Sequence, residues 1–223
     1  MPMEKTILLV WSLLISTFPV SALDVGDISS FMHSNDSMIS KEIKNTTTSG
    51  RFINIHVDRI TSPLDNGETI PMDSKNELLF TPGSLLLPAK SNEIIRFYYN
   101  GPEDNRERYY RITWLDQALS EGQRNNSSRN AIATVSARIS TILVVAPRKV
   151  KYDYQYTPGK ILNTGNATLR LIAYGPCLTQ RSRECKENYF LMPGKSRVFT
   201  HVDVSNPNGH IAFWQAEHFI PIK

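Results

Sequence analysis

The chain has 223 residues, of which 40% are hydrophobic and 21% are charged, and its formal net charge at pH 7 is +4. This composition excludes an extended disordered chain, and the length suffices for one large globular domain or two domains of about 100 residues each. Basic residues are scattered among acidic ones rather than gathered on one face, so nucleic acid is not an expected partner.

The first 22 residues have the pattern of a secretory signal peptide. Lys5 precedes an apolar run at residues 7–15, and Val20-Ser21-Ala22 provides small residues for a cleavage site near Ala22. The apolar run is too short to cross a bilayer, which takes about 20 apolar residues. The alternatives, a membrane-anchored N-terminus or a buried first helix, are disfavoured by Pro19. We therefore expect an exported protein.

The remaining sequence predicts β-strands almost throughout. Apolar residues recur at spacing two, Val, Ile, Tyr, Phe and Thr are common, and Pro or Gly interrupts the chain repeatedly. Strands are predicted at residues 23–31, 38–44, 52–60, 77–81, 93–100, 108–115 and 131–145. Seven strands with intervening turns are typical of one immunoglobulin-like sandwich, which we assign to residues 23–146.

Residues 116–130 are polar and rich in Ser and Asn. They predict a long mobile loop, and such loops are either functional or merely variable surface segments. The strand that follows has Ala131, Ala133, Val135, Ala137 and Ile139 on one alternation. Such a strand could lend its edge to another chain by β-augmentation, although an ordinary core strand has the same pattern.

A second, smaller domain is predicted at residues 147–223, with the hinge at Pro147. Its strands are expected at residues 151–156, 160–162, 168–174, 189–191, 197–202 and 211–214. So short a segment barely supports its own core, so packing against the first domain and a covalent link would both matter. We expect the two domains to meet at an angle, with a cleft between them.

The only two cysteines, Cys177 and Cys185, are eight positions apart. In an oxidising compartment such a pair suggests a local disulfide, which contributes about 2.5 kcal/mol by loop entropy. Zinc is the competing interpretation, but no second Cys pair or close His pair completes a tetrahedral site. No metal site is expected.

No catalytic signature occurs. The five histidines form no metal-hydrolase motif, no Gly-x-Ser-x-Gly or Cys–His signature is present, and no glycine loop resembles a phosphate cradle. We expect a non-enzymatic protein without a cofactor or a small-molecule substrate.

Several stretches, taken in order, resemble the periplasmic pilus-assembly chaperones. They are Phe80-Thr81-Pro82-Gly83 with the following Leu85-Leu86-Leu87-Pro88, the strand around Trp114, the strand at residues 131–145, Leu162-Asn163-Thr164-Gly165, and Met192-Pro193-Gly194. Leu23-Asp24-Val25-Gly26, with Tyr174-Gly175-Pro176-Cys177, is most similar to the chaperones of the common pilus, the EcpB-like group.

This resemblance implies an all-β protein with two immunoglobulin-like β-sandwich domains in a boomerang arrangement, located in the periplasm. The implied partners are pilin subunits, which are sandwiches that lack a strand, and an outer-membrane usher. By donor-strand complementation the chaperone fills the missing place and delivers the subunit for pilus assembly, hence for adhesion and biofilm formation. Aligning Pro147 with the family's hinge proline makes Ala133, Val135, Ala137 and Ile139 the residues that face this client.

The family also binds the client's C-terminal carboxylate with an arginine on the first strand and a lysine near the end of the donor strand. Here Ile28 and Ile142 fall at those positions. Arg111, Arg138 and Arg148 are the candidate anchors instead, because a guanidinium can bind a carboxylate through two hydrogen bonds. Each could equally be a solvated surface arginine.

Two other functions remain open from the sequence. A structural pilus subunit or adhesin would need an N-terminal donor extension, and residues 23–31 are too short to be both extension and first strand. A secreted immunoglobulin-like binding module of eukaryotic origin would carry glycans at its Asn-x-Ser/Thr tripeptides, among them those at Asn35, Asn45 and Asn166. The mass of the exported protein would reveal such glycans.

Overall fold

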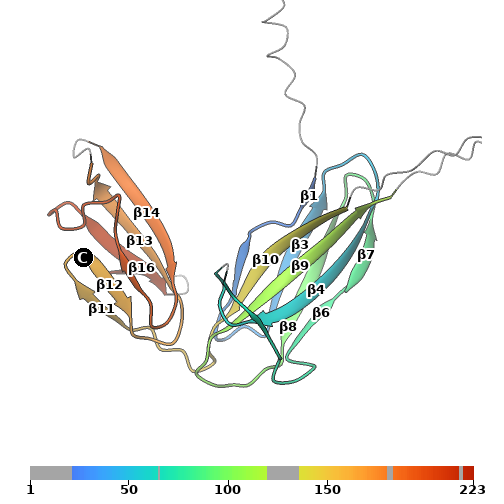
Figure 1. Cartoon of the computed structure of the whole chain (residues 1–223), viewed down its shortest axis with the longest axis horizontal. Coiled ribbons are helices and arrows are strands. Elements are labelled where there is room, and N and C mark those ends of the chain that lie inside the picture. Colours follow the sequence, from blue (N-terminus) through green and yellow to red (C-terminus); the bar gives the residue numbers. More distant parts are fainter. Residues whose placement is uncertain (1–21, 65, 120–135, 180–182, 216–217) are drawn as a thin grey trace, which may run out of the picture.

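The computed structural model describes residues 22–64, 66–119, 136–179, 183–215 and 218–223. They form two lobes joined at one end, like the arms of a V (Figure 1). Every regular element in these ranges is a strand, which confirms the all-β prediction. Over the same ranges, no helix is long and apolar enough to cross a membrane.

The first lobe is a sandwich of two sheets. The smaller sheet has the strand order β1-β3-β8-β6, and the larger one has the order β2-β10-β9-β4-β5, with β7 also pairing with β4. The strands are β1 (Leu23–Asp24), β2 (Ser29–Met32), β3 (Met38–Asn45), β4 (Arg51–Ile60), β5 (Thr69–Ile70), β6 (Leu78–Thr81), β7 (Ser84–Leu87), β8 (Asn92–Tyr99), β9 (Arg108–Ala118) and β10 (Ser136–Val145).

Spacing-two alternation directs the side chains of these strands into one core. On β4, Ile53, Ile55 and Val57 are buried while the residues between them face away. Phe97 of β8 and Trp114 of β9 meet across the two sheets with ring centroids 6.4 Å apart. The core of the first lobe therefore lies between the two sheets and contains side chains from both.

The second lobe has its own two sheets and its own core. Their strand orders are β11-β12-β15 and β14-β13-β16-β17. The strands are β11 (Tyr154–Thr157), β12 (Lys160–Asn163), β13 (Leu169–Pro176), β14 (Glu184–Leu191), β15 (Ser196–Val198), β16 (His210–Gln215) and β17 (His218–Pro221). Leu169, Leu171 and Phe213 lie in its core, which is separate from that of the first lobe.

Cys177 and Cys185 form a disulfide, as the sequence predicted, with their Cα atoms 5.0 Å apart. Two positions further along β14, the carboxylate of Glu187 is buried and accepts hydrogen bonds from the backbone N–H groups of Thr200, His201 and Val202. The disulfide attaches β14 to the residue that follows β13, and the Glu187 carboxylate attaches β14 to the segment after β15.

The first predicted strand, at residues 23–31, is wrong in one respect. It is two strands in different sheets, because β1 pairs with β3 in the smaller sheet and β2 pairs with β10 in the larger one. Gly26 lies between them with φ +68°, a backbone conformation that a regular strand does not contain. Residues 25–28 therefore cross from one sheet to the other, and they are called the crossing segment below.

Candidate functional site

One half of β10 lies at an open sheet edge. β10 pairs with β9 along its whole length, whereas β2 pairs on the other side only with residues 142–145. Within the described ranges, no strand covers residues 136–141 on that side. We call this stretch the open edge of β10; β10 is the yellow strand of the first lobe in Figure 1. An uncovered edge is a template for pairing with another chain.

Backbone direction shows which amides the open edge presents. Ile142 donates its N–H to the carbonyl oxygen of Ile28 at 2.7 Å, so this amide points toward β2 and away from β9. N–H and C=O groups alternate in direction along a strand, so the peptide groups of Ser136, Arg138 and Ser140 also point away from β9. These three residues supply the hydrogen-bonding groups of the open edge.

The side chains of β10 divide between a closed half and an open half. On the inward alternation the residues nearest the hinge are buried, and these are Thr141, Leu143 and Val145. Further out, Ile139 is half-buried against the core and Ala137 is exposed. Of the residues predicted to face a client, these two therefore follow the inward alternation. Ala133 and Val135 lie outside the described residues.

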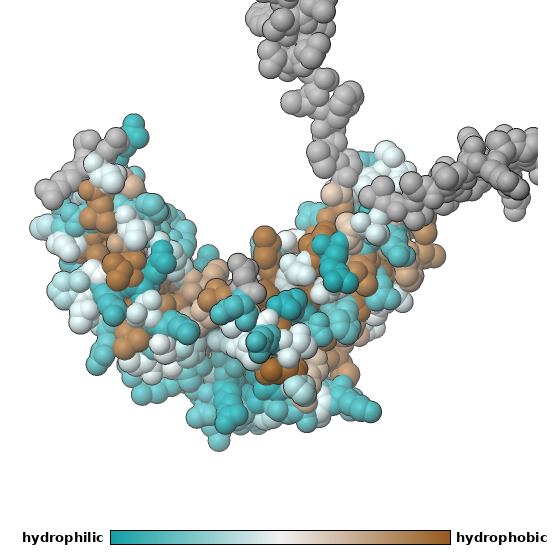
Figure 2. Space-filling view, in the orientation of Figure 1, coloured by the Kyte–Doolittle hydropathy of each residue, from teal (hydrophilic) through white to brown (hydrophobic). Residues whose placement is uncertain are grey.

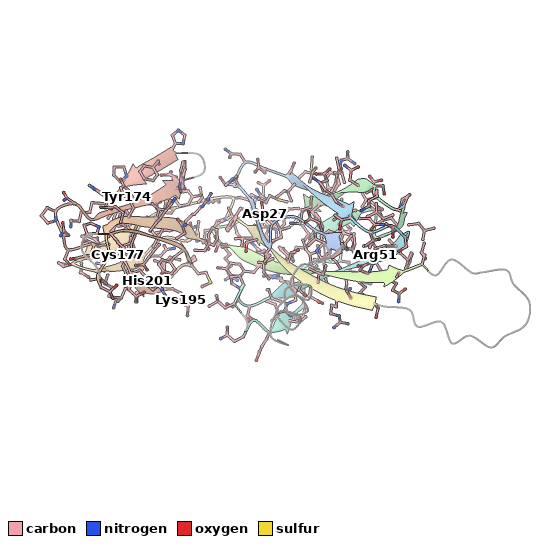
Figure 3. All side chains as sticks on the ribbon, turned by 90° about the horizontal axis from the view of Figure 1, so that it is seen from above. Asp27, Arg51, Tyr174, Cys177, Lys195 and His201 are labelled. Atoms are coloured by element: carbon pink, nitrogen blue, oxygen red, sulfur yellow. A yellow bond between two sulfur atoms is a disulfide. The ribbon has the colours of Figure 1, made fainter. Side chains whose placement is uncertain are left out.

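A cleft separates the two lobes. A cavity of about 720 Å³ is lined by residues 24–31 and part of β3 from the first lobe, and by Arg170 and Phe190 from the second. Figure 2 shows the surface hollowed between the lobes, and Figure 3 places Asp27 on the side of the first lobe that faces the second. The cleft begins where the open edge of β10 ends, because Ile28 is bonded to Ile142 there.

Aromatic and aliphatic side chains form the floor of this cleft. The rings of Phe31 and Phe190 lie 4.9 Å apart and join the two lobes. A small pocket of about 110 Å³ beside them is lined by Ile142 and Met192, among others. Ile28, which is 72% exposed, lines the larger cavity. The two isoleucines that stand where the family resemblance places cations thus both lie at the cleft.

The three candidate anchor arginines do not converge on one site. Arg111 is half-buried on β9, opposite Ile142, and donates a hydrogen bond to the carbonyl oxygen of Gly67 at 3.0 Å. Arg138 is exposed and lies four positions before Ile142 on β10, roughly 13 Å along the strand.

Arg148 lies just beyond β10 and is engaged within the first lobe. Its guanidinium donates to the carbonyl oxygens of His33, Ser34 and Asp36 at 2.6 to 2.9 Å and stands over the ring of Tyr99, 4.8 Å from its centroid. These contacts fix the loop between β2 and β3. Arg148 thus has an evident structural role.

Three cations at the cleft escaped the sequence analysis. Arg170 reaches the cavity from β13, and Lys41 and Lys44 reach it from β3. Of these, Lys41 is almost fully buried. Lys41 stands on the inward alternation of β3, together with Ile43 and Asn45. A charged residue at an inward position of an alternating strand was the available signal.

A hydrogen-bonded contact joins the lobes at the hinge. The carboxylate of Glu107 accepts bonds from the backbone N–H and the hydroxyl of Thr168, both at 2.6 Å, and from the hydroxyl of Tyr109. Burial raises the pKa of the Glu107 carboxyl, and these donors offset part of that effect. Nearby, the side-chain amide of Asn166 donates to the carbonyl oxygens of Asn105 and Lys149.

The groups at the cleft are suited to binding an extended chain. In the part of the chain that the structure describes, no group of three or more His, Cys, Asp or Glu residues could hold a metal ion. What the site offers is a row of backbone hydrogen-bonding groups at the open edge of β10, leading into a cleft with an apolar floor.

Comparisons with known proteins agree along the whole chain. Residues 152–222 match the family described as the EcpB C-terminal domain. The probable fimbrial chaperone EcpB of Klebsiella pneumoniae (strain 342) is 61% identical over 222 residues, which cover 99% of this chain and 100% of that relative. The probable fimbrial chaperone EcpB of Escherichia coli O157:H7 is 60% identical with the same coverage.

Among solved structures, the class 5 fimbriae chaperone CfaA has a similar fold. Its TM-score is 0.54 at 16% sequence identity, and the match covers 90% of this chain and 97% of that one. At this identity the likeness shows the two-sandwich fold alone.

Proposed function

Because the chain belongs to the EcpB family of fimbrial chaperones, we propose that it holds pilus subunits at the open edge of β10. The chain is a periplasmic chaperone that binds pilin subunits and delivers them for pilus assembly. The observation that supports this placement of the binding site is that β2 covers only residues 142–145 of β10 and leaves residues 136–141 uncovered in the described structure.

In this proposal the client adds a strand beside the outer half of β10. Its backbone bonds to the outward peptide groups of Ser136, Arg138 and Ser140, while the alternate side chains enter the client's incomplete core. These side chains are Ala133, Val135, Ala137 and Ile139. Their burial at about 25 cal/mol per Å² contributes several kcal/mol, offset by the cost of association.

One alternation of β10 then contributes to two cores. Its inner members, Thr141 and Leu143, are buried in the chaperone's own sandwich. The outer members belong to the client while it is bound, and half-buried Ile139 lies at the boundary. The alanines keep this face shallow, so we expect a client with a narrow groove.

Of the three candidate arginines, Arg138 is the one we assign to a client carboxylate. It is exposed on the open half of β10, and a guanidinium can bind a carboxylate through two parallel hydrogen bonds. Arg111 and Arg148 are already bonded to backbone carbonyl groups of the first lobe. These bonds make both less suitable.

We further propose that residues 1–22 direct export and are removed near Ala22. The support is the sequence pattern together with the periplasmic location of this family. Determining the N-terminal sequence of protein taken from the periplasm tests this; a mature chain that still begins at Met1 contradicts it.

The decisive experiment is co-purification with a pilus subunit expressed in the same periplasm. Val135→Asp combined with Ala137→Asp places two charges on the proposed client-facing alternation and is expected to abolish the complex. Ser136→Asp is the matched control, since it adds a charge at an exposed neighbouring position on the opposite alternation. A folded double variant that still yields the complex contradicts this placement of the binding site.

A further inference from the structure

The crossing segment is what leaves half of β10 uncovered. β1 ends at Asp24 in the smaller sheet, and β2 begins at Ser29 in the larger one. Asp24 accepts a hydrogen bond from the N–H of Gly26 at 2.8 Å, and Gly26 adopts φ +68°. A side chain at position 26 would strain this turn, so the local sequence itself specifies the change of sheet.

Without the crossing, the chain's own first strand would occupy the open edge. β2 is parallel to β10, with Ser29 beside Ile142. Continuing this register backward by four residues places the crossing segment beside residues 138–141 of β10, where the outward backbone groups of Ser140 and Arg138 have no strand beside them in the described structure. The crossing segment and a client strand therefore compete for the same backbone groups.

Lys41 holds the crossing segment away from that edge. Its ammonium group donates to the carbonyl oxygen of Asp27 at 2.7 Å and to the hydroxyl of Ser30 at 2.9 Å. These two residues flank Ile28 and Ser29, where the chain joins the larger sheet. The side chain thus reaches from β3 in one sheet to the start of β2 in the other, closing the side of the sandwich at which the crossing occurs.

This arrangement is costly for the fold alone. Lys41 is 6% exposed, and both of its hydrogen-bond partners are neutral oxygens. Burial lowers the pKa of its ammonium group, and the charge of Asp27 offsets part of that effect. Because burying an ammonium group is unfavourable, an apolar residue would suit an inward position of β3 better if packing were its only role.

We propose that Lys41 is a positioning residue for client binding, which keeps the crossing segment off the open edge of β10. It acts through residues 27–30 and does not itself contact the client. The link to client binding rests on the proposed function; the effect on the open edge does not.

Hydrogen exchange in the free protein tests the proposal without any client. In Lys41→Met the crossing segment is released to pair with β10, so the amides of Arg138 and Ser140 are expected to exchange at least about fivefold more slowly than in wild type. A merely structural role predicts the reverse, faster exchange in a loosened domain. Unchanged or faster exchange at these amides overturns the proposal.

Three further variants make the test specific. Lys41→Arg keeps a donor and should restore fast exchange, whereas Lys44→Met changes an exposed lysine of the same strand and should have no effect. Ser30→Ala removes one of the two bonds, so it should slow exchange in the same direction but less; it replaces Lys41→Met if that variant does not fold. No slowing in Ser30→Ala then overturns the proposal.

Binding of a purified pilus subunit separates this inference from the proposed function. If Lys41→Met protects the open edge and weakens subunit binding several-fold, both the positioning role of Lys41 and the placement of the client at this edge are supported. If the edge is protected but binding is unchanged, the role of Lys41 in client binding and the placement of the client at this edge both fail, while its effect on the crossing segment stands.

Discussion

Glu187 shows how a single charged residue holds part of a small domain together. Its carboxylate is almost fully buried, and it accepts bonds from the hydroxyl of Tyr189 and from the backbone N–H groups of Thr200, His201 and Val202. Burial opposes ionisation, but these donors more than offset it and leave the pKa of Glu187 below its usual value. The ionised carboxylate therefore belongs to the folded state.

Glu187→Gln should destabilise the second domain by about 1–3 kcal/mol, because an amide nitrogen cannot accept the bonds that one carboxylate oxygen receives. A lowered pKa stabilises the fold above the ordinary carboxyl pKa, and this contribution is lost as the pH falls through the folded value. Urea unfolding between pH 7 and pH 3 should therefore show wild type and variant converging at low pH. Glu184→Gln, an exposed change on the same strand, is the control. A difference in unfolding free energy between wild type and Glu187→Gln that stays constant from pH 7 to pH 3 contradicts the role assigned to the ionised carboxylate.

A second residue-scale contact fixes the inner half of β10. The indole N–H of Trp114 donates to the hydroxyl of Thr141 at 3.0 Å, and both side chains are fully buried. Thr141 is the last residue of the open edge, next to the part of β10 that β2 covers. The bond attaches β10 to β9 through a side chain that lies in the core, so it does not use the outward backbone groups of the open edge.

Thr141→Val keeps the shape of the side chain but leaves the Trp114 donor unsatisfied. The expected cost is about 1–3 kcal/mol of folding free energy, measured by denaturant unfolding. Affinity for a pilus subunit should change by less than about twofold, because the Thr141 side chain lies in the core of the first lobe and its backbone groups point toward β9. Thr157→Val, at an exposed position of β11, serves as the comparison. A large loss of affinity at unchanged stability would place Thr141 in the binding site instead.

At the scale of elements, the spacing-two pattern predicted most strands that carry the core, but it shortened β14 and missed β7. β14 was predicted only at residues 189–191, yet it begins at Glu184, because its inward residue Glu187 is a carboxylate satisfied by backbone groups from another segment. β7 was missed because Pro82, Gly83 and Pro88 around it indicate turns. The sequence around β14 does not reveal that the partners of Glu187 lie in a separate segment of the chain.

The candidate site could be predicted in outline and not in detail. The alternation of β10 follows from the sequence, and so does the family resemblance. That β2 stops short of residue 141 does not follow, because it depends on where the first strand changes sheet. Gly26 and the inward Lys41 were visible signals of that change, but their meaning depends on Asp27 and Ser30, which only the folded chain brings to Lys41.

At the scale of the whole molecule, the lobes are held at the hinge by Glu107 and Thr168 and at the cleft floor by Phe31 and Phe190. The strength of the hinge contact depends on whether the Glu107 carboxyl is ionised. A carboxyl with a raised folded pKa stabilises the fold below its ordinary value and loses that contribution as the pH rises through the folded value.

Comparing wild type with Glu107→Gln over pH 4 to pH 8 tests this. The stability of wild type relative to the variant should fall as the pH rises above 4.5, no more steeply than about 1.4 kcal/mol per pH unit for one proton. Glu103→Gln, an exposed change in the same connection, should leave the profile of wild type unaltered. A relative stability that rises with pH contradicts the assigned direction.

The buried inner half of β10 also sets the spacing of whatever binds its outer half. Thr141, Leu143 and Val145 are locked in the core, so the strand cannot slide by one residue without exposing them. Outer side chains of one alternation therefore recur at a fixed interval of roughly 6.6 Å. Subunits that share this chaperone are expected to resemble one another in the periodicity of the hollows along their grooves, while the residues that line those hollows are free to differ.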